Sequence, residues 1–244
     1  MELDDPRRIR ELRALIARKP ALRRFYEEVY EQYVDCLDRC PEQGIVVELG
    51  SGASFIKRYI PEVITSDPIP YEGVDQVIDA TRMPFANNSV RAIFMLNVFH
   101  HIPDSEAFLK EAERVLMPGG RVFMRDQHVG WLSRIILKYA HHEPFDAGAQ
   151  EWKFASTGPL SGANGALAWI VFMRDRERFE RKFPSFRIAR YEPNTPFRYW
   201  LAGGLKSWSL LPGFAVGAFT RVERRLVALH KGWSCFVDVE LVRS

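Results

Sequence analysis

The chain has 244 residues, of which 47% are hydrophobic and 27% are charged, a composition that is typical of a folded globular protein and excludes disorder as its main state. Its 34 basic and 31 acidic residues leave a net charge of only +3. We expect no nucleic-acid partner, because nucleic-acid binders usually carry a stronger basic excess on one face.

The sequence also favours a cytoplasmic location and predicts no metal site. Its start lacks the apolar core of a signal peptide, and it contains no run of about 18 uncharged apolar residues that would span a bilayer. The three cysteines, Cys36, Cys40 and Cys235, show no metal-ligand spacing. Such an odd, unpatterned set is typical of a reducing compartment.

The first 43 residues predict a helical cap. Apolar residues recur at helical spacing on both sides of Pro20, and Pro41 and Gly44 end this section. The second of the two stripes is rich in aromatic side chains. Its members are Leu22, Phe25, Tyr26, Val29, Tyr30 and Tyr33.

From residue 44 onward, predicted strands and helices alternate. The strands cover residues 44–50, 63–67, 76–79, 90–98 and 121–125. A helix is predicted over residues 104–116, with Asp104 as its N-cap and Pro118-Gly119-Gly120 as its stop. This alternation predicts an α/β fold in which helices cover both faces of a parallel sheet.

After residue 127 the alternation is less regular. A helix is predicted over residues 131–139, and a loop rich in small residues over 141–167. The remaining elements are a short charged helix that Asp175 caps and that ends near Phe183, a strand at 186–191, an apolar stretch at 197–220, a helix at 222–229 and a last strand at 233–242.

The segment Glu48-Leu-Gly50-Ser51-Gly52 lies where the first strand is predicted to turn into a first helix. The glycines permit a tight turn and let a ligand approach the backbone. A dinucleotide site would need a third glycine, but Phe55 stands there. The carboxylate of Glu48 would repel a pyrophosphate, whereas it suits a ligand with an ammonium or sulfonium charge.

This segment resembles motif I of the class I S-adenosylmethionine-dependent methyltransferases, of the small-molecule type with a core like methyltransferase domain 11. Four later segments agree with that family in order. They are Asp67-Pro68 after the second strand, Asp79-Ala80 before Met83-Pro84-Phe85, the stretch from Asn97 to Asp104, and Leu116-Met-Pro118-Gly119-Gly120. The five segments cover about a third of the chain.

The resemblance implies a fold, a cofactor and a set of cofactor-binding residues. The fold is a Rossmann-like, doubly wound sheet of seven strands in the order 3-2-1-4-5-7-6, with the last strand antiparallel. The cofactor is S-adenosyl-L-methionine, with Glu48 near its amino-acid part, Asp67 at the ribose hydroxyls and Asp79 at the adenine. The full expected set is Glu48, Gly50, Ser51, Gly52, Asp67, Pro68, Asp79, Ala80 and Asn97.

We expect one domain over residues 1–244. It comprises an N-terminal helical cap at 1–43, a cofactor-binding core at 44–127, acceptor-side insertions that form a lid at 128–232, and the last strand at 233–244. A base is needed only if the acceptor must lose a proton. The candidates are His100, His101 and His128, and two further histidines, His141 and His142, lie in the insertion.

The acceptor is expected to meet residues 128–232, which contain five of the six tryptophans, the sixth being Trp233. Residues 199–220 carry a single charge, and basic residues follow them. This pattern predicts a lid, extra core, or a surface at 199–231 that touches a membrane peripherally or grips a lipid tail. Asn164 and Trp200 are candidate acceptor-binding residues, and the acceptor is expected to be a small or lipid-linked, partly hydrophobic molecule methylated at oxygen, nitrogen or carbon.

Two alternatives remain at this point. One is a nicotinamide-dependent oxidoreductase on a related Rossmann fold, which Glu48 and the missing third glycine disfavour. The other is a non-catalytic, methyltransferase-like partner subunit, which the intact set of Glu48, Gly50, Gly52, Asp67 and Asp79 disfavours.

Overall fold

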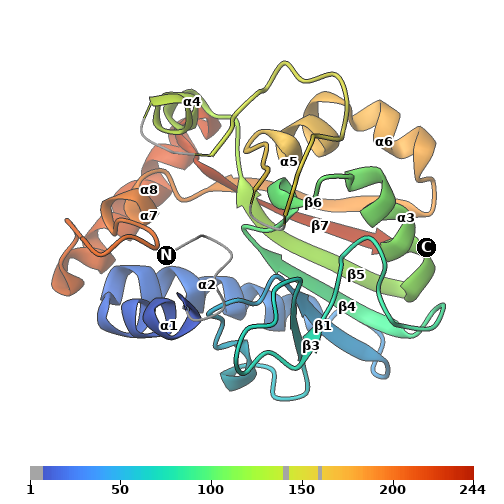
Figure 1. The fold of residues 1–244 in the computed structure, drawn as a ribbon. Helices are drawn as coiled ribbons and strands as arrows, with labels where there is room; N and C mark the ends of the chain where they lie inside the picture. Colours follow the sequence, from blue (N-terminus) through green and yellow to red (C-terminus); the bar gives the residue numbers. More distant parts are fainter. Residues whose placement is uncertain (1–7, 140–142, 159–160) are drawn as a thin grey trace.

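The computed structural model describes residues 8–139, 143–158 and 161–244 (Figure 1). Its centre is a seven-stranded sheet in the order β3-β2-β1-β4-β5-β7-β6. Neighbouring strands from β3 to β5 run parallel, and β7 is antiparallel to both of its neighbours, so the expected topology is confirmed. The strands are β1 (Ile45–Leu49), β2 (Ile64–Asp67), β3 (Gln76–Val77), β4 (Val90–Leu96), β5 (Leu116–Gln127), β6 (Phe186–Asn194) and β7 (Phe236–Arg243).

Helices cover both faces of this sheet. The helices are α1 (Arg8–Arg18), α2 (Pro20–Leu37), α3 (Ser105–Val115), α4 (Trp131–Tyr139), α5 (Leu167–Trp169), α6 (Arg176–Lys182), α7 (Arg198–Leu201) and α8 (Val216–Leu229). The short helical turns are η1 (Ile56–Arg58), η2 (Phe99–His101), η3 (Ile170–Arg174), η4 (Gly213–Ala215) and η5 (Lys231–Trp233). No helix in the described ranges is long and apolar enough to cross a membrane.

The aromatic stripe predicted in the cap lies on α2 and packs on one face of the sheet. The ring of Tyr33 stacks on Phe94 of β4, with centroids 4.4 Å apart, and meets the edge of Phe123 of β5. Phe25 contacts Phe236 of β7, with centroids 5.2 Å apart. The helical period of the cap therefore places its aromatic residues against alternate side chains of three strands.

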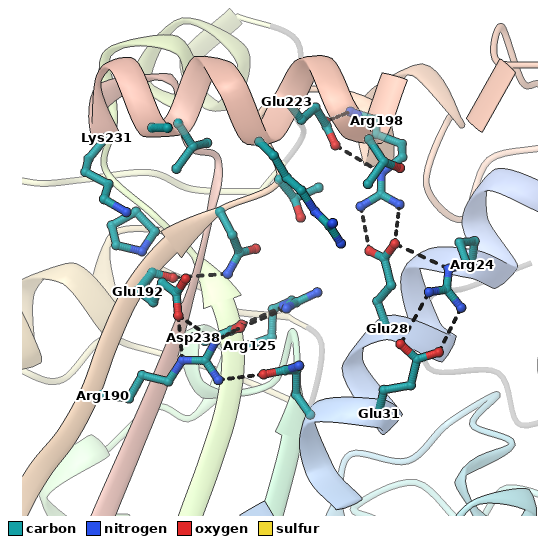
Figure 2. A pocket seen from close by; sticks show the side chains of 18 residues that line it. Arg24, Glu28, Glu31, Arg125, Arg190, Glu192, Arg198, Glu223, Lys231 and Asp238 are labelled. Carbon is teal, nitrogen blue, oxygen red and sulfur yellow. Dashed lines mark hydrogen bonds and ion pairs between the residues drawn. The ribbon is translucent and has the colours of Figure 1, made fainter. Parts of the chain in front are cut away.

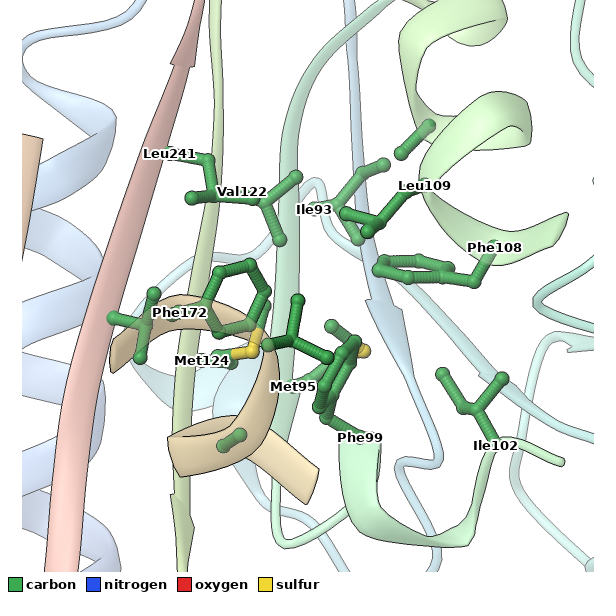
Figure 3. Close-up of a cluster of buried hydrophobic side chains, with 14 of the residues drawn as sticks. Ile93, Met95, Phe99, Ile102, Phe108, Leu109, Val122, Met124, Phe172 and Leu241 are labelled. Carbon is green, nitrogen blue, oxygen red and sulfur yellow. The ribbon is translucent and has the colours of Figure 1, made fainter. Parts of the chain in front are cut away.

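The opposite face of the sheet packs against α3, α5, η3 and α6 (Figure 3). Ile93 and Met95 of β4 point to this side, because successive residues of a strand alternate between faces. They meet Phe108 and Leu109 of α3, while Phe172 of η3 covers β5 and β7. Each fully buried side chain of this kind contributes roughly 1.5–3 kcal/mol, and the layer holds η2 firmly beside the end of β4.

Two expectations about local structure are wrong. The glycine turn is not followed by a full helix, because residues 53–61 form only turns and the 3-10 helix η1. The side chain of Tyr30 on α2 supports this segment instead. Its hydroxyl accepts a hydrogen bond from the backbone N–H of Phe55 (3.3 Å) and forms a hydrogen bond with Ser54 Oγ (2.9 Å). Likewise, Pro118-Gly119-Gly120 does not separate helix and strand, because β5 begins at Leu116, directly after α3.

The region after β5 largely follows the predicted elements. Helix α4 has the expected bounds, whereas α8 begins at Val216, earlier than expected. Gln127 at the end of β5 pairs with Phe236 at the start of β7. The segments that flank these two residues, α4 on one side and α7 with α8 on the other, therefore lie at the carboxyl edge of the parallel strands (Figure 1). His141 and His142 lie outside the described residues.

Candidate functional site

The glycine turn after β1 lies directly against the end of β4. Gly50 and Gly52 have φ angles of +65° and +45°, a conformation that other residues rarely adopt. A Cβ atom on Gly50 would lie 2.3 Å from Cγ2 of Val98, so only glycine fits at this position. The turn and the segment Asn97-Val98 therefore form one rigid surface at the carboxyl ends of β1 and β4.

Asp67 fastens this turn to β2. Its Oδ2 accepts a hydrogen bond from the backbone N–H of Gly52 (3.0 Å), and its Oδ1 accepts one from that of Ile69 (3.0 Å). The backbone N–H of Ser51 donates to the carbonyl of Ser66 (2.7 Å). Burial raises the pKa of Asp67 to about 6, against the opposing effect of the two backbone donors. Each carboxylate oxygen has a further lone pair, so Asp67 can still accept from a ligand hydroxyl.

Two buried oxygen atoms beside the turn have no hydrogen-bond partner among the described residues. They are Oε2 of Glu48 and Oδ1 of Asn97. Glu48 is 2% exposed, and burial raises its pKa to about 7, although Ser54 and Ser51 oppose this. Buried acceptors without a donor are costly and rare in folded proteins. They fit a ligand that brings an ammonium group, as the methionine part of S-adenosylmethionine does.

The strand register fixes the position of Asp79, another of the expected cofactor-binding residues. Asp67 pairs with Val77 of β3, so Asp79 lies two residues beyond the same sheet edge. Its carboxylate is exposed and accepts from the backbone N–H and the hydroxyl of Thr81, both at 2.8 Å. Pro68 is exposed and Ala80 is partly buried.

His100 and His101 lie on η2, where they form a charged cluster. Nδ1 of His100 is 2.6 Å from Oδ1 of Asp126, and its Nε2 is 3.2 Å from Oε2 of Glu143. Nε2 of His101 is 3.5 Å from the other oxygen of Glu143. Burial lowers the pKa of His100, but the negative charges of Asp126 and Glu143 outweigh it and raise the pKa to about 10. Burial likewise opposes ionisation of Glu143, whose pKa the two histidines nevertheless lower well below its usual range.

His128, the third candidate base, stands apart from this cluster. It follows β5 and lies 3.2 Å from the hydroxyl of Tyr191, measured from Nδ1. Burial lowers its pKa to about 4, so it is neutral at physiological pH. A neutral imidazole can accept a proton, whereas His100 in its protonated state cannot.

The two candidate acceptor-binding residues differ in surroundings. The backbone N–H of Asn164 donates to the carbonyl of His100 (2.9 Å), and its side chain bonds to both the N–H and the carbonyl of Asp146. Asn164 thus holds the insertion against η2. Trp200 of α7 stacks on Phe236, with centroids 5.9 Å apart, and is partly buried.

Sequence reasoning missed Asp126, Gln127 and Glu143. The first two had a usable signal, because they end β5 at the carboxyl edge of the sheet, where ligands of such folds bind. Glu143 had none, since it lies in an irregular segment remote in sequence from η2.

A polar cavity of about 410 Å³ lies elsewhere, between α2, β6 and α8 (Figure 2). Its buried charges are paired: Arg198 contacts Glu28 (2.6 Å) and Glu223 (3.0 Å), and Arg125 forms two hydrogen bonds to Asp238. Because Arg198 ties together α2, α7 and α8, we interpret these contacts as structural.

Comparison with known proteins identifies a known domain in about a third of the chain. A family model described as "Methyltransferase domain" matches residues 48–124, from Glu48 of the glycine turn into β5. The chain carries a class I S-adenosylmethionine-dependent methyltransferase domain. A solved structure of similar fold, the geranyl diphosphate C-methyltransferase of Streptomyces coelicolor, contains S-adenosyl-L-homocysteine (16% identity, 96% of this chain and 83% of that one, TM-score 0.50).

Curated relatives and solved structures of methyltransferases also resemble the chain. A possible histamine N-methyltransferase from Thermotoga maritima shares the fold over 100% of both chains, with a TM-score of 0.56 and 14% identity. The ubiquinone/menaquinone biosynthesis C-methyltransferase UbiE of Acidiphilium cryptum is 27% identical over 157 residues, which are 64% of this chain and 52% of that protein. UbiE of Desulfotalea psychrophila is 39% identical over 56 residues, 22% of this chain and 23% of that protein. The chain therefore spans about half or less of the length of these curated relatives.

Proposed function

We propose that this methyltransferase transfers the methyl group of S-adenosylmethionine to a small or lipid-linked, partly hydrophobic acceptor. The observation that carries the proposal is the pair of unpartnered buried oxygens, Glu48 Oε2 and Asn97 Oδ1, on either side of the glycine turn. Glu48 and Asn97 are assigned to the methionine ammonium group, Asp67 to the ribose hydroxyls and Asp79 to the adenine. Gly50, Ser51 and Gly52 supply close backbone contacts, and Pro68 and Ala80 flank the nucleoside.

The residues of the chain act mainly by positioning. Bound S-adenosylmethionine supplies a methyl group that its sulfonium already activates for displacement. The rigid turn and Asp67 fix the electrophile, and the insertion after β5 aligns the acceptor and excludes water. Where the acceptor is a hydroxyl, His128 is the candidate base, and His100 and His101 shape the acceptor side of the site together with Asp126 and Glu143.

The assignment of a hydrophobic acceptor rests on residues 128–232. Apolar side chains remain exposed on α4 and along the segment that leads into α8. They are Trp131, Ile135 and Tyr139, and then Leu205, Trp208, Leu210 and Phe214. Trp131 of α4 contacts both His230 and Trp233, so α4 and the end of α8 adjoin each other at the carboxyl edge. We propose that an acceptor of the quinone, polyketide or lipid-linked sugar type enters here, next to Asn164 and Trp200.

Among these acceptor types, a quinone-like molecule is supported by the UbiE relatives, which are named for ubiquinone and menaquinone biosynthesis. We further propose that the reaction takes place in the cytoplasm, with residues 199–231 touching a membrane peripherally. The basic side chains of Arg221, Arg224, Arg225 and Lys231 beside the apolar segment favour an anionic surface.

Calorimetric titration tests the cofactor assignment. The full chain should bind S-adenosylhomocysteine and not NADH or NADPH, and Glu48→Gln should weaken that binding. Binding of a nicotinamide nucleotide instead would favour the oxidoreductase.

Methyl transfer is tested with methyl-labelled S-adenosylmethionine and a panel of acceptors. The panel contains a prenylated hydroquinone, an aromatic polyketide, an undecaprenyl-linked sugar and, as a polar comparison, histamine. We expect label in an apolar acceptor. Cofactor binding without label in any acceptor, including an organic extract of the source cells, would favour the non-catalytic subunit.

A further inference from the structure

Both histidines of η2 have one ring nitrogen fixed by an oxygen acceptor. Nδ1 of His100 contacts Oδ1 of the buried Asp126 at 2.6 Å, and Nδ1 of His101 lies 3.1 Å from the carbonyl of Gly162. An acceptor at Nδ1 holds a hydrogen there, so Nε2 is the nitrogen that would give up its proton to a metal ion. This arrangement, in which a carboxylate or carbonyl orients a histidine through its second nitrogen, is the one found behind histidines that bind metals.

The two Nε2 atoms face one carboxylate. His100 Nε2 is 3.2 Å from Oε2 of Glu143, and His101 Nε2 is 3.5 Å from its Oε1. One ligand atom from each of the three residues lies within 4.8 Å of the others. Two ligands bound about 2.0–2.1 Å from a tetrahedral zinc ion are roughly 3.3–3.4 Å apart, so the two histidine–carboxylate separations are close to those of a metal site.

We propose that His100, His101 and Glu143 bind one divalent transition-metal ion, with zinc as the best fit to two imidazoles and a carboxylate. Three protein ligands leave at least one coordination position open, as in catalytic zinc sites. Gln127, whose amide nitrogen lies 3.0 Å from Oε2 of Glu143 and 3.4 Å from Nε2 of His100, closes one side of the cluster. The sequence predicted no metal site because its ligands come from two remote segments that only the fold brings together.

The cluster adjoins Asn164 of the acceptor-side insertion, whose backbone N–H donates to the carbonyl of His100 (2.9 Å). An acceptor hydroxyl bound to the ion loses its proton to water more readily, because the cation stabilises the oxyanion. This role rests on the proposed function, whereas the binding of the ion does not.

The test measures metal binding by the full chain, stripped with chelator and then titrated with Zn²⁺ or Co²⁺ in the absence of cofactor. We expect one equivalent of the metal ion to bind. The visible absorption spectrum of bound Co²⁺ should be that of an ion with fewer than six ligands. Glu143→Gln and His101→Ala should each weaken binding at least tenfold, and Asp126→Asn by about 10–100-fold through the orientation of His100. His230→Ala, which removes an exposed histidine on the end of α8, is the matched control and should bind as the wild type does.

S-adenosylhomocysteine affinity and circular dichroism are recorded for every variant. If neither ion binds the wild type, or if Glu143→Gln and His101→Ala bind as tightly as it does, the metal site is refuted and the cluster is a buried ion pair. Should zinc bind while S-adenosylhomocysteine does not, the metal site stands and the proposed function fails. A variant that loses its folded spectrum is replaced by His101→Gln, which keeps the volume and must still lose the ion.

Discussion

The backbone N–H of Gly52 donates a hydrogen bond to Oδ2 of Asp67 over 3.0 Å, and this bond joins the glycine turn after β1 to the end of β2. Asp67 is therefore both a candidate ribose ligand and a structural support of the turn. Glu48, by contrast, has an oxygen for which the described residues offer no hydrogen-bond donor. The two carboxylates should respond differently to substitution.

Asp67→Ala should weaken binding of S-adenosylhomocysteine and also lower stability. It removes the two charge-assisted bonds proposed to the ribose, each worth on the order of 1.5–3 kcal/mol, and leaves the N–H groups of Gly52 and Ile69 without their acceptor. Glu48→Gln should lose affinity at little cost in stability. Calorimetry and urea unfolding of both variants check this, and unchanged affinity in Asp67→Ala would refute the ribose assignment.

Cofactor affinity should rise with pH between about 5.5 and 7, because the pKa of Glu48, raised to about 7 by burial, keeps the carboxyl largely neutral below that range. Binding of an ammonium group favours the ionised form, so each pH unit gains at most about tenfold. Titrations of the wild type and Glu48→Gln at several pH values test this. An equal slope in both proteins would contradict it.

Stability of the free protein should change in the opposite direction. Glu48 and Asp67 have folded-state pKa values of about 7 and about 6, above their ordinary values of 4.5 and 3.8. Between its ordinary pKa and its folded-state pKa, each group binds more protons in the folded state than in the unfolded chain. The stability that each group contributes is therefore lost as the pH rises through its folded-state pKa. Relative to Glu48→Gln, the wild type should thus become less stable in urea from pH 4.5 to pH 7.

The sequence was sufficient for what depends on local pattern. The aromatic period of α2, the Asp104 cap of α3 and the strand before Gly50 all follow from residue spacing, while the strand order came from family resemblance. Residue spacing could not show that Tyr30, and not a full helix, supports the segment after the glycine turn. The hydrogen bond between Tyr30 and Phe55 joins two segments that are remote in the sequence. The same limit hid Glu143, whose partners on η2 are brought to it only by the folded insertion.

Gly50→Ala should abolish tight cofactor binding. The new Cβ would lie 2.3 Å from Val98 at a φ of +65°, so the turn must distort away from the end of β4. Gly217→Ala on α8 is the matched control, because a Cβ added there would meet no atom within 4 Å. It should instead raise the free energy of unfolding by about 0.5–1 kcal/mol. Wild-type affinity in Gly50→Ala would show that the turn does not need its observed conformation.

Arg198→Met should destabilise the protein by about 3–5 kcal/mol, because it leaves the buried carboxylate of Glu223 without its counter-charge. Arg24→Met removes an arginine that contacts Glu28 and Glu31 from an exposed position, and such pairs contribute about 1 kcal/mol or less. Urea unfolding of the two variants compares the free energy of unfolding that is lost with a buried ion pair and with an exposed ion pair at the same cavity. Equal losses would mean that Arg198 does not hold α2 and α8 together.

Membrane contact by residues 199–231 should depend on the apolar side chains that remain exposed there. Trp200 packs on Phe236, whereas Trp208 is 45% exposed, Leu210 72% and Phe214 93%. These exposed apolar side chains precede Arg221 and Arg224 in the sequence, a combination that is typical of surfaces that bind anionic lipid. The wild type should sediment with anionic vesicles, less so at high salt because charges are screened, and Leu210→Ser/Phe214→Ser should remain in the supernatant.

Val77→Ser, which removes an exposed apolar side chain on β3 away from this segment, should sediment like the wild type. If the wild type stays in the supernatant, or if the double variant still sediments, residues 199–231 do not contact lipid, and the exposed side chains there serve only an acceptor that reaches the site from solution.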